Sequence, residues 1–165
     1  MSFFDHTKQT LWRLIYPIFP KVQKILLRTG ILHHEGRQPY PVGWLAPGKT
    51  LEGLKTHLKN AWGFGNHFVA WIDTDQVLSW RKLESFETQY HLRVFADGEI
   101  RGHYEFTPEA HPYKHFYAHG EKESREMFLT FLGDYVIAEK HTTDLSSYLT
   151  EKKHEPQIIF QEHRA

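Results

Sequence analysis

Apolar residues recur at helical spacing through the first thirty positions of the chain. They are Leu11, Leu14, Ile15, Ile18, Val22, Ile25 and Leu26. An interior proline removes a backbone hydrogen bond and clashes with the preceding turn, so Pro17 and Pro20 rule out one straight helix. We therefore predict two short helices, the second beginning near Pro20 and ending at Gly30.

The second of these helices carries positive charge on one side. Lys21, Lys24 and Arg28 fall at i, i+3 and i+7, away from its apolar residues. We expect the basic side to face solvent while the apolar side packs against the core.

A loop followed by a third helix is predicted next. Residues 36–49 hold three prolines and three glycines, which is typical of a loop. Thr50 then suits the N-cap of a helix running to Trp62 and ended by Gly63.

Beyond this helix the apolar pattern changes to the alternation of β-strands, interrupted by turn residues. Three strand pairs are predicted: HFVAWID with QVLSWRK across Asp-Thr-Asp, QYHLRVF with EIRGHYEF across Asp97-Gly98, and MFLTFL with YVIAEK across Gly133-Asp134. Successive hairpins favour an antiparallel sheet. The expected fold is therefore α+β, with a mainly antiparallel sheet and helices from the N-terminal third packed on it. We expect one domain over residues 1–141 and a polar, loosely held tail over 142–165.

The composition of the chain tells more about its cellular compartment than about its fold. The 165 residues suffice for one domain with a core, and the absence of cysteine excludes disulfides and thiolate chemistry. The first residues do not resemble a signal peptide, and no apolar run reaches 18 residues. We expect a cytoplasmic protein without a membrane partner.

The net charge of zero hides an asymmetry along the chain. Residues 1–83 carry 11 basic and 5 acidic residues, whereas residues 84–165 carry 9 and 15. No acid occurs between Asp5 and Glu35, a stretch that holds Lys8, Arg13, Lys21, Lys24 and Arg28. This indicates an anionic partner for the N-terminal part. A membrane-surface helix is the alternative, because Trp12, Tyr16 and Phe19 accompany the charges; we disfavour it because the apolar face is needed for the core.

The stretch GWLAPGKT, residues 43–50, matches the phosphate-loop pattern of nucleotide-binding proteins. A phosphate loop follows a buried parallel strand, but the preceding segment is polar and holds two prolines. Pro47 also removes a backbone N–H that should donate to phosphate. We therefore interpret the match as a loop and a helix cap.

Alternating His and Tyr residues mark the stretch HPYKHFYAH. An extended chain places His111, Tyr113, His115, Tyr117 and His119 on one face. Three interpretations stay open: a half-exposed sheet face, a surface for stacking RNA bases, and an acid–base pair of a metal-independent ribonuclease. Residues four apart on a strand are about 13 Å distant, so one metal ion cannot bind two of these histidines.

The acidic residues predict no metal site. Asp73 and Asp75 occupy a turn, where Asp commonly bonds its own backbone. Glu121, Glu123 and Glu126 are typical of a solvated cluster. No enzyme motif is present, and we expect neither a cofactor, a metal nor catalytic residues.

Two stretches combine strands and turns in a pattern that has a counterpart elsewhere. They are FVAWIDTDQVLSWRKL, with Trp71, Asp73 and Trp80, and QYHLRVFADGEIRGHYEF, with Arg93 to Phe95, Asp97, Gly98 and Glu99 to Arg101. Together they resemble a family of small accessory subunits of type III-D CRISPR effector complexes. The similarity covers about forty residues. It implies a non-catalytic protein that joins a multisubunit RNA-guided ribonucleoprotein in antiviral defence, with no catalytic residues to carry over.

The expected function is therefore that of an assembly subunit that contacts other protein subunits and guide or target RNA, directly or through the complex. The residues expected to bind RNA or a partner are Lys8, Arg13, Lys21, Lys24, Arg28, Tyr113, His115 and Tyr117. One alternative is a small ribonuclease that uses members of the set His103, His111, His115 and His119. A third possibility is nucleotide binding through residues 43–50 and Lys49.

Overall fold

A computed structural model gives the fold of the chain. It describes residues 40–65, 75–107 and 125–151, apart from the side chains of 150 and 151, together with residues 7, 10, 11, 14, 18, 21, 22, 25, 28–30, 37, 110, 111 and 114.

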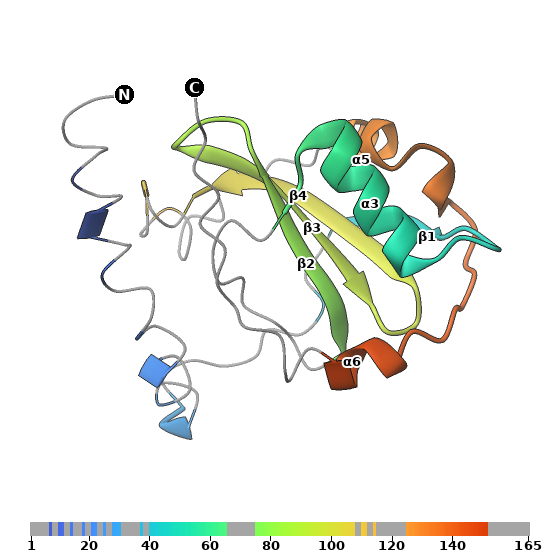
Figure 1. The fold of residues 1–165 in the computed structure, drawn as a ribbon, viewed down its shortest axis with the longest axis horizontal. Coiled ribbons are helices and arrows are strands. Elements are labelled where there is room, and N and C mark those ends of the chain that lie inside the picture. The colour runs from blue at the N-terminus through green and yellow to red at the C-terminus, as the bar shows by residue number, and fades with distance from the viewer. Residues whose placement is uncertain are drawn as a thin grey trace.

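The described part of the chain folds around an antiparallel sheet of five strands in the order β2-β3-β4-β1-β5 (Figure 1). The strands are β1 (Pro41–Leu45), β2 (Gln76–Leu83), β3 (Thr88–Phe95), β4 (Glu99–Phe106) and β5 (Val136–Ile137). The helices are α3 (Leu51–Trp62), α5 (Arg125–Leu132) and α6 (Ser147–Glu151), with a 3₁₀ turn, η1, at Gly133–Tyr135. The predicted α+β class is confirmed, but the helices do not all come from the N-terminal third, because α5 and α6 lie in the C-terminal part of the chain.

Helix α3 forms as its sequence predicts. The Thr50 side chain accepts a hydrogen bond from the Gly53 backbone N–H, and Gly63 ends the helix in the left-handed region at φ 72°. Its three buried residues, Leu51, Leu54 and Leu58, recur at helical spacing and join the core.

The hairpin of β3 and β4 is also confirmed. Gly98 takes the positive φ of 86° that the turn requires, and its N–H donates to the Phe95 carbonyl. The register that follows places His91 opposite His103 and Leu92 opposite Gly102. For the first predicted hairpin, only the strand at 76–82 lies among the described residues, and it is confirmed as part of β2.

Helices α3 and α5 lie side by side on one face of the sheet (Figure 1). Gly102 of β4 makes this packing possible, because a Cβ at that position would lie 2.7 Å from the Phe128 ring of α5. The rings of Phe128 and Phe131 also contact Tyr90 of β3 edge-on. The apolar core therefore fills the space between this face and the two helices.

The prediction of a loop over residues 36–49 is wrong for residues 41–45 and holds for residues 46–49. Residues 41–45 form β1, which pairs with β4 and β5. Pro41 is tolerated because it is the first residue of the strand. Gly43 lets β5 approach, since a Cβ there would lie 2.4 Å from the Ile137 carbonyl oxygen.

The prediction of a strand pair around Gly133-Asp134 is also wrong. MFLTFL belongs to α5, where Phe128, Phe131 and Leu132 recur at i, i+3 and i+4 and are all buried. An apolar run of six residues suits either a strand or a helix, and packing against the sheet decides for the helix. Only Val136 and Ile137 of the second segment form a strand.

The expected loose tail is held against the sheet in its described part. The Thr143 N–H donates to the Asp97 carbonyl, the Leu145 N–H donates to the Ala96 carbonyl, and the Leu145 side chain is buried. Residues 152–165 lie outside the described residues. Leu145, Tyr148 and Leu149 recur at i, i+3 and i+4, but three apolar residues in a polar stretch are too few for periodicity to indicate a packed segment.

Candidate functional site

Strands β2, β3 and β4 have one apolar face and one polar face, and both are buried. Because Leu92 and Gly102 face α5, the residues that alternate with them face away from the helices. The buried residues of this second face, here called the polar face, are Ser79, Arg81, Gln89, His91, Arg93, Glu99, His103 and Glu105, each at most 8 % exposed. Burying so many charged groups is costly unless they pair, so this face is the candidate site.

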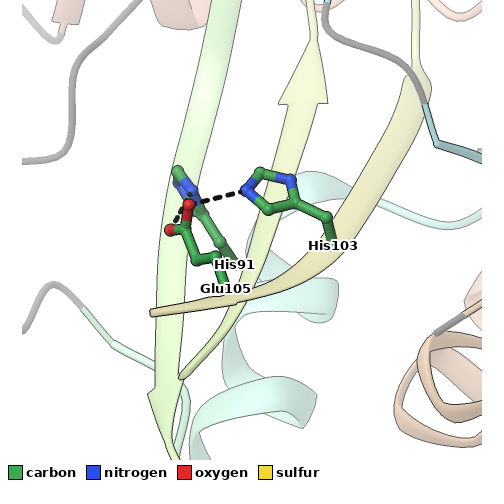
Figure 2. Close-up of side chains that lie close together, drawn as sticks. All are labelled: His91, His103 and Glu105. Carbon is green, nitrogen blue, oxygen red and sulfur yellow. Dashed lines mark hydrogen bonds and ion pairs between the residues drawn. The ribbon is translucent and has the colours of Figure 1, made fainter. Parts of the chain in front are cut away.

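Two histidines and one glutamate converge at the centre of the polar face (Figure 2). His91 Nδ1 lies 3.2 Å from one carboxylate oxygen of Glu105, and His103 Nε2 lies 2.9 Å from the other. The two imidazole centroids are 5.2 Å apart at an angle of 66°. We call these three residues the His–Glu–His cluster.

Neighbouring polar side chains orient the cluster. Ser79 Oγ lies 2.9 Å from His91 Nε2, within hydrogen-bonding distance. The Gln89 side-chain amide donates a 2.6 Å hydrogen bond to Glu105, which is its direct cross-strand neighbour. Glu105 and His91 are therefore each held from more than one side.

Tyr40 lies beside the cluster, and its own backbone is strained. It has a φ of 77°, in the left-handed region that tyrosine rarely adopts, and its carbonyl accepts the Gly102 N–H. Its ring centroid lies 6.2 Å from that of His103. Such strain is characteristic of positions that the surrounding structure holds in place for a function.

Burial and neighbouring charges shift the pKa values of His91 and Glu105. Burial lowers the pKa of His91 well below its usual range, and the positive charge of Arg93 adds to this while Glu105 opposes it. Burial raises the pKa of Glu105, but hydrogen bonds with His103 and His91 outweigh it and hold that pKa well below the usual range. A neutral His91 and an ionised Glu105 are therefore the forms present at neutral pH.

An ion cluster at the turn of the β3–β4 hairpin has a structural role. The Arg37 guanidinium donates to Asp75 at 2.6 Å and 2.9 Å, to Asp97 at 2.7 Å and to Glu99 at 2.6 Å, and it stacks on the Phe95 ring. The three acids raise the pKa of Arg37 despite its burial. Asp75 thus pairs with an arginine, whereas Asp73 lies outside the described residues.

The sequence-predicted binding residues are only partly described. Lys21 and Arg28 are exposed, as expected, whereas Lys8, Arg13, Lys24, Tyr113, His115 and Tyr117 lie outside the described residues. Of the predicted ribonuclease histidines, His103 is buried in the cluster, and His111 lies 3.7 Å from Glu87 and beside Phe106. His115 and His119 are not among the described residues.

The N-terminal segment, residues 7–30, does not pack through its described apolar residues as predicted. Its described large apolar residues are exposed by 44 % to 69 %: Leu11, Leu14, Ile18, Val22 and Ile25. The core between the sheet and helices α3 and α5 is filled without them. The segment therefore presents both an apolar stripe and positive charge at the surface.

The phosphate-loop pattern lies in a different setting from that of a nucleotide site. Its first residues belong to β1, which is antiparallel to both neighbours rather than parallel. Lys49 forms an ion pair with Asp134 and lies over the Tyr135 ring. The Thr50 hydroxyl is used as the helix cap.

Sequence reasoning missed the His–Glu–His cluster, although it predicted the hairpin that carries it. A two-residue turn at Asp97-Gly98 would pair His91 with Tyr104, whereas the turn between β3 and β4 spans three residues, Ala96 to Gly98. The register that results places His91 opposite His103 and Gln89 opposite Glu105. The burial of that face had no sequence signal, because alternating polar residues normally indicate a solvent-exposed face.

No helix among the described residues is both long and apolar enough to cross a membrane. Comparison with protein families, curated proteins and solved structures gave no match.

Proposed function

We propose that the chain is a non-catalytic assembly subunit of a multisubunit RNA-guided effector ribonucleoprotein, of the type III CRISPR class that its central hairpins resemble. The observation that carries the proposal is the exposed N-terminal segment. Its apolar stripe, with Lys21 and Arg28 also exposed, lies outside the core cluster. Large exposed apolar residues together with charge are characteristic of interaction surfaces.

The proposed binding partner of this segment is another protein subunit, which offers an acidic, partly apolar groove. An amphipathic helix binds such a groove through anchors at i, i+3, i+4 and i+7, and Ile18, Val22 and Ile25 follow this spacing. The adjacent positive charges complement an acidic rim and accelerate association. Lys8, Arg13 and Lys24 extend this charge, and RNA reaches the subunit directly or through the complex.

The test is capture of the tagged chain from its native host at low salt, followed by identification of bound proteins and RNA. The parent chain should recover effector subunits and guide RNA, and Lys21→Glu with Arg28→Glu should reduce recovery at least tenfold. The matched control is Lys59→Glu, an exposed lysine on α3, which should have no effect. Recovery of the parent chain alone and free of RNA contradicts the proposal.

The apolar stripe calls for its own pair of variants. Ile18→Ser with Ile25→Ser should abolish capture, whereas Met127→Ser, an exposed apolar residue of α5, should not. Binding of the parent chain to anionic phosphatidylserine vesicles, lost in the same stripe variants, would assign the segment to a membrane surface instead. Nuclease treatment before capture separates direct RNA contact from contact through other subunits.

A ribonuclease is the second candidate function, and the polar face is the observation that favours it. His103 lies beside His91, with Arg81 and Arg93 on the same face. Paired imidazoles and guanidinium groups can transfer protons and hold a phosphate. The purified chain would then cleave RNA in the presence of a chelator, and His103→Ala would abolish the activity; RNA that stays intact excludes this function.

A further inference from the structure

We propose that His91, His103 and Glu105 form a binding site for a divalent transition-metal ion, with Zn²⁺ as the reference ion. One potential ligand atom from each residue lies within 4.8 Å of the other two. Two imidazoles and one carboxylate are a recurrent set for catalytic zinc and for non-haem iron. The inference is independent of the assembly function proposed above.

The geometry is close to that of an occupied site. A tetrahedral ion with bonds of about 2.0–2.1 Å separates its ligand atoms by roughly 3.4 Å. One carboxylate oxygen of Glu105 lies 3.2 Å from His91 Nδ1, the other lies 2.9 Å from His103 Nε2, and one ligand atom from each residue lies within 4.8 Å of the other two. Rotation of the side chains drawn in Figure 2 can bring the three ligand atoms to the spacing that one ion requires.

The backbone holds the three ligands in position. All three residues lie on β3 and β4, which pair from Thr88 to Val94, and His91 and His103 are direct cross-strand partners. Sites built on paired strands are more rigid than sites built on loops. The cluster therefore loses little conformational entropy when an ion binds.

The surrounding polar groups have the arrangement found around metal ligands. With an ion on His91 Nδ1, the proton moves to Nε2, which lies 2.9 Å from Ser79 Oγ and can donate to it. Gln89 donates to Glu105 and fixes the carboxylate. Such outer partners set the tautomer and orientation of the ligands.

The nearby arginines indicate which further ligand would complete the coordination of the metal ion. Arg93 Nη2 lies 3.5 Å from His91 Nδ1, and Arg81 is the cross-strand partner of His91. Three protein ligands leave at least one position open, and two guanidinium groups near a dication favour an anion there. We infer that the open position takes a small oxyanion, such as a carboxylate.

The first experiment measures Zn²⁺ binding to the full, untagged chain after removal of metals with a chelator. Because each ligand residue is at most 3 % exposed, the ion is added both to the folded protein and during refolding. Calorimetry should show one equivalent of tight binding, accompanied by a higher melting temperature. Failure to load one equivalent by either route overturns the proposal.

Variants assign the binding to these residues. His103→Gln and Glu105→Gln should each weaken Zn²⁺ binding at least about 100-fold, and Ser79→Ala should weaken it about tenfold through the orientation of His91. His111→Gln, a histidine outside the cluster, is the control and should bind like the parent chain. Unchanged binding in the folded His103→Gln and Ser79→Ala variants overturns the proposal, because the ion then lies elsewhere.

A Co²⁺-loaded chain tests the open position without any substitution. The visible absorption of Co²⁺ reports its ligands, so the spectrum should show nitrogen and oxygen coordination and should change when formate is added. If formate leaves the spectrum unchanged, the inference that the open coordination position takes a small oxyanion is wrong.

Discussion

At the scale of single residues, the polar face explains how charged side chains are tolerated inside the sheet. Glu105 accepts hydrogen bonds from Gln89 and two imidazoles, so its charge is compensated on several sides. Arg37 compensates three further acids at the hairpin turn. Removing one partner of such a group leaves a buried charge, which is usually more destabilising than replacing both.

The lowered pKa of His91 predicts how stability depends on pH. Burial and Arg93 disfavour the protonated imidazole in the folded chain, whereas the unfolded chain takes up a proton near pH 6.5. The contribution of His91 to the stability of the folded chain is therefore complete above about pH 6.5, and it is lost as the pH falls below that value. Arg81, His103, Glu105 and Ser79 also face this imidazole and share its environment.

Urea unfolding at pH 7.5 and pH 5.5, with a chelator present, measures this effect. The parent chain should lose stability at the lower pH, and His91→Gln should reduce the loss. His111→Gln should leave it unchanged. A parent chain that is equally stable at both pH values contradicts the assignment of a neutral His91.

At the scale of elements, local signals succeeded where the deciding interactions are local. The cap of α3 and the turn of the β3–β4 hairpin involve residues close in sequence, and both were predicted. The strand at Pro41–Leu45 and the helix at Arg125–Leu132 depend on distant partners, and both predictions failed. Short apolar runs take the structure that their tertiary neighbours favour.

The cap of α3 yields a prediction at this scale. Thr50→Ala removes the side-chain acceptor of the Gly53 N–H and should lower the free energy of unfolding by about 1 kcal/mol. Thermal and urea unfolding both report the change. Thr56→Ala, at an exposed position inside the same helix, should be neutral or slightly stabilising. Equal effects of the two substitutions would show that the cap is not what stabilises this end.

At the scale of the whole molecule, the chain after β5 completes the core. Leu145 joins the core cluster, and Tyr148 and Leu149 pack against it, although this region looked like a polar tail. Backbone hydrogen bonds to the hairpin turn fix its path. The N-terminal segment contrasts with it, because its described apolar residues stay exposed.

Substitution of Leu145 tests this contribution. Leu145→Ala should reduce the free energy of unfolding by about 2–5 kcal/mol, since it removes a buried side chain and leaves a cavity. Thr142→Ala, at an exposed position of the same segment, is the control and should change it little. A loss well below 1 kcal/mol would mean that residues after β5 are not part of the cooperative core.

The sequence by itself determined helix α3 and the existence of the β3–β4 hairpin. These depend on capping and on glycine at positive φ, which act over a few residues. The tertiary structure decided the place of β1 between β4 and β5, the helical state of residues 125–132, and the burial of the polar face. Those features depend on surfaces far apart in the chain, whose packing no local pattern encodes.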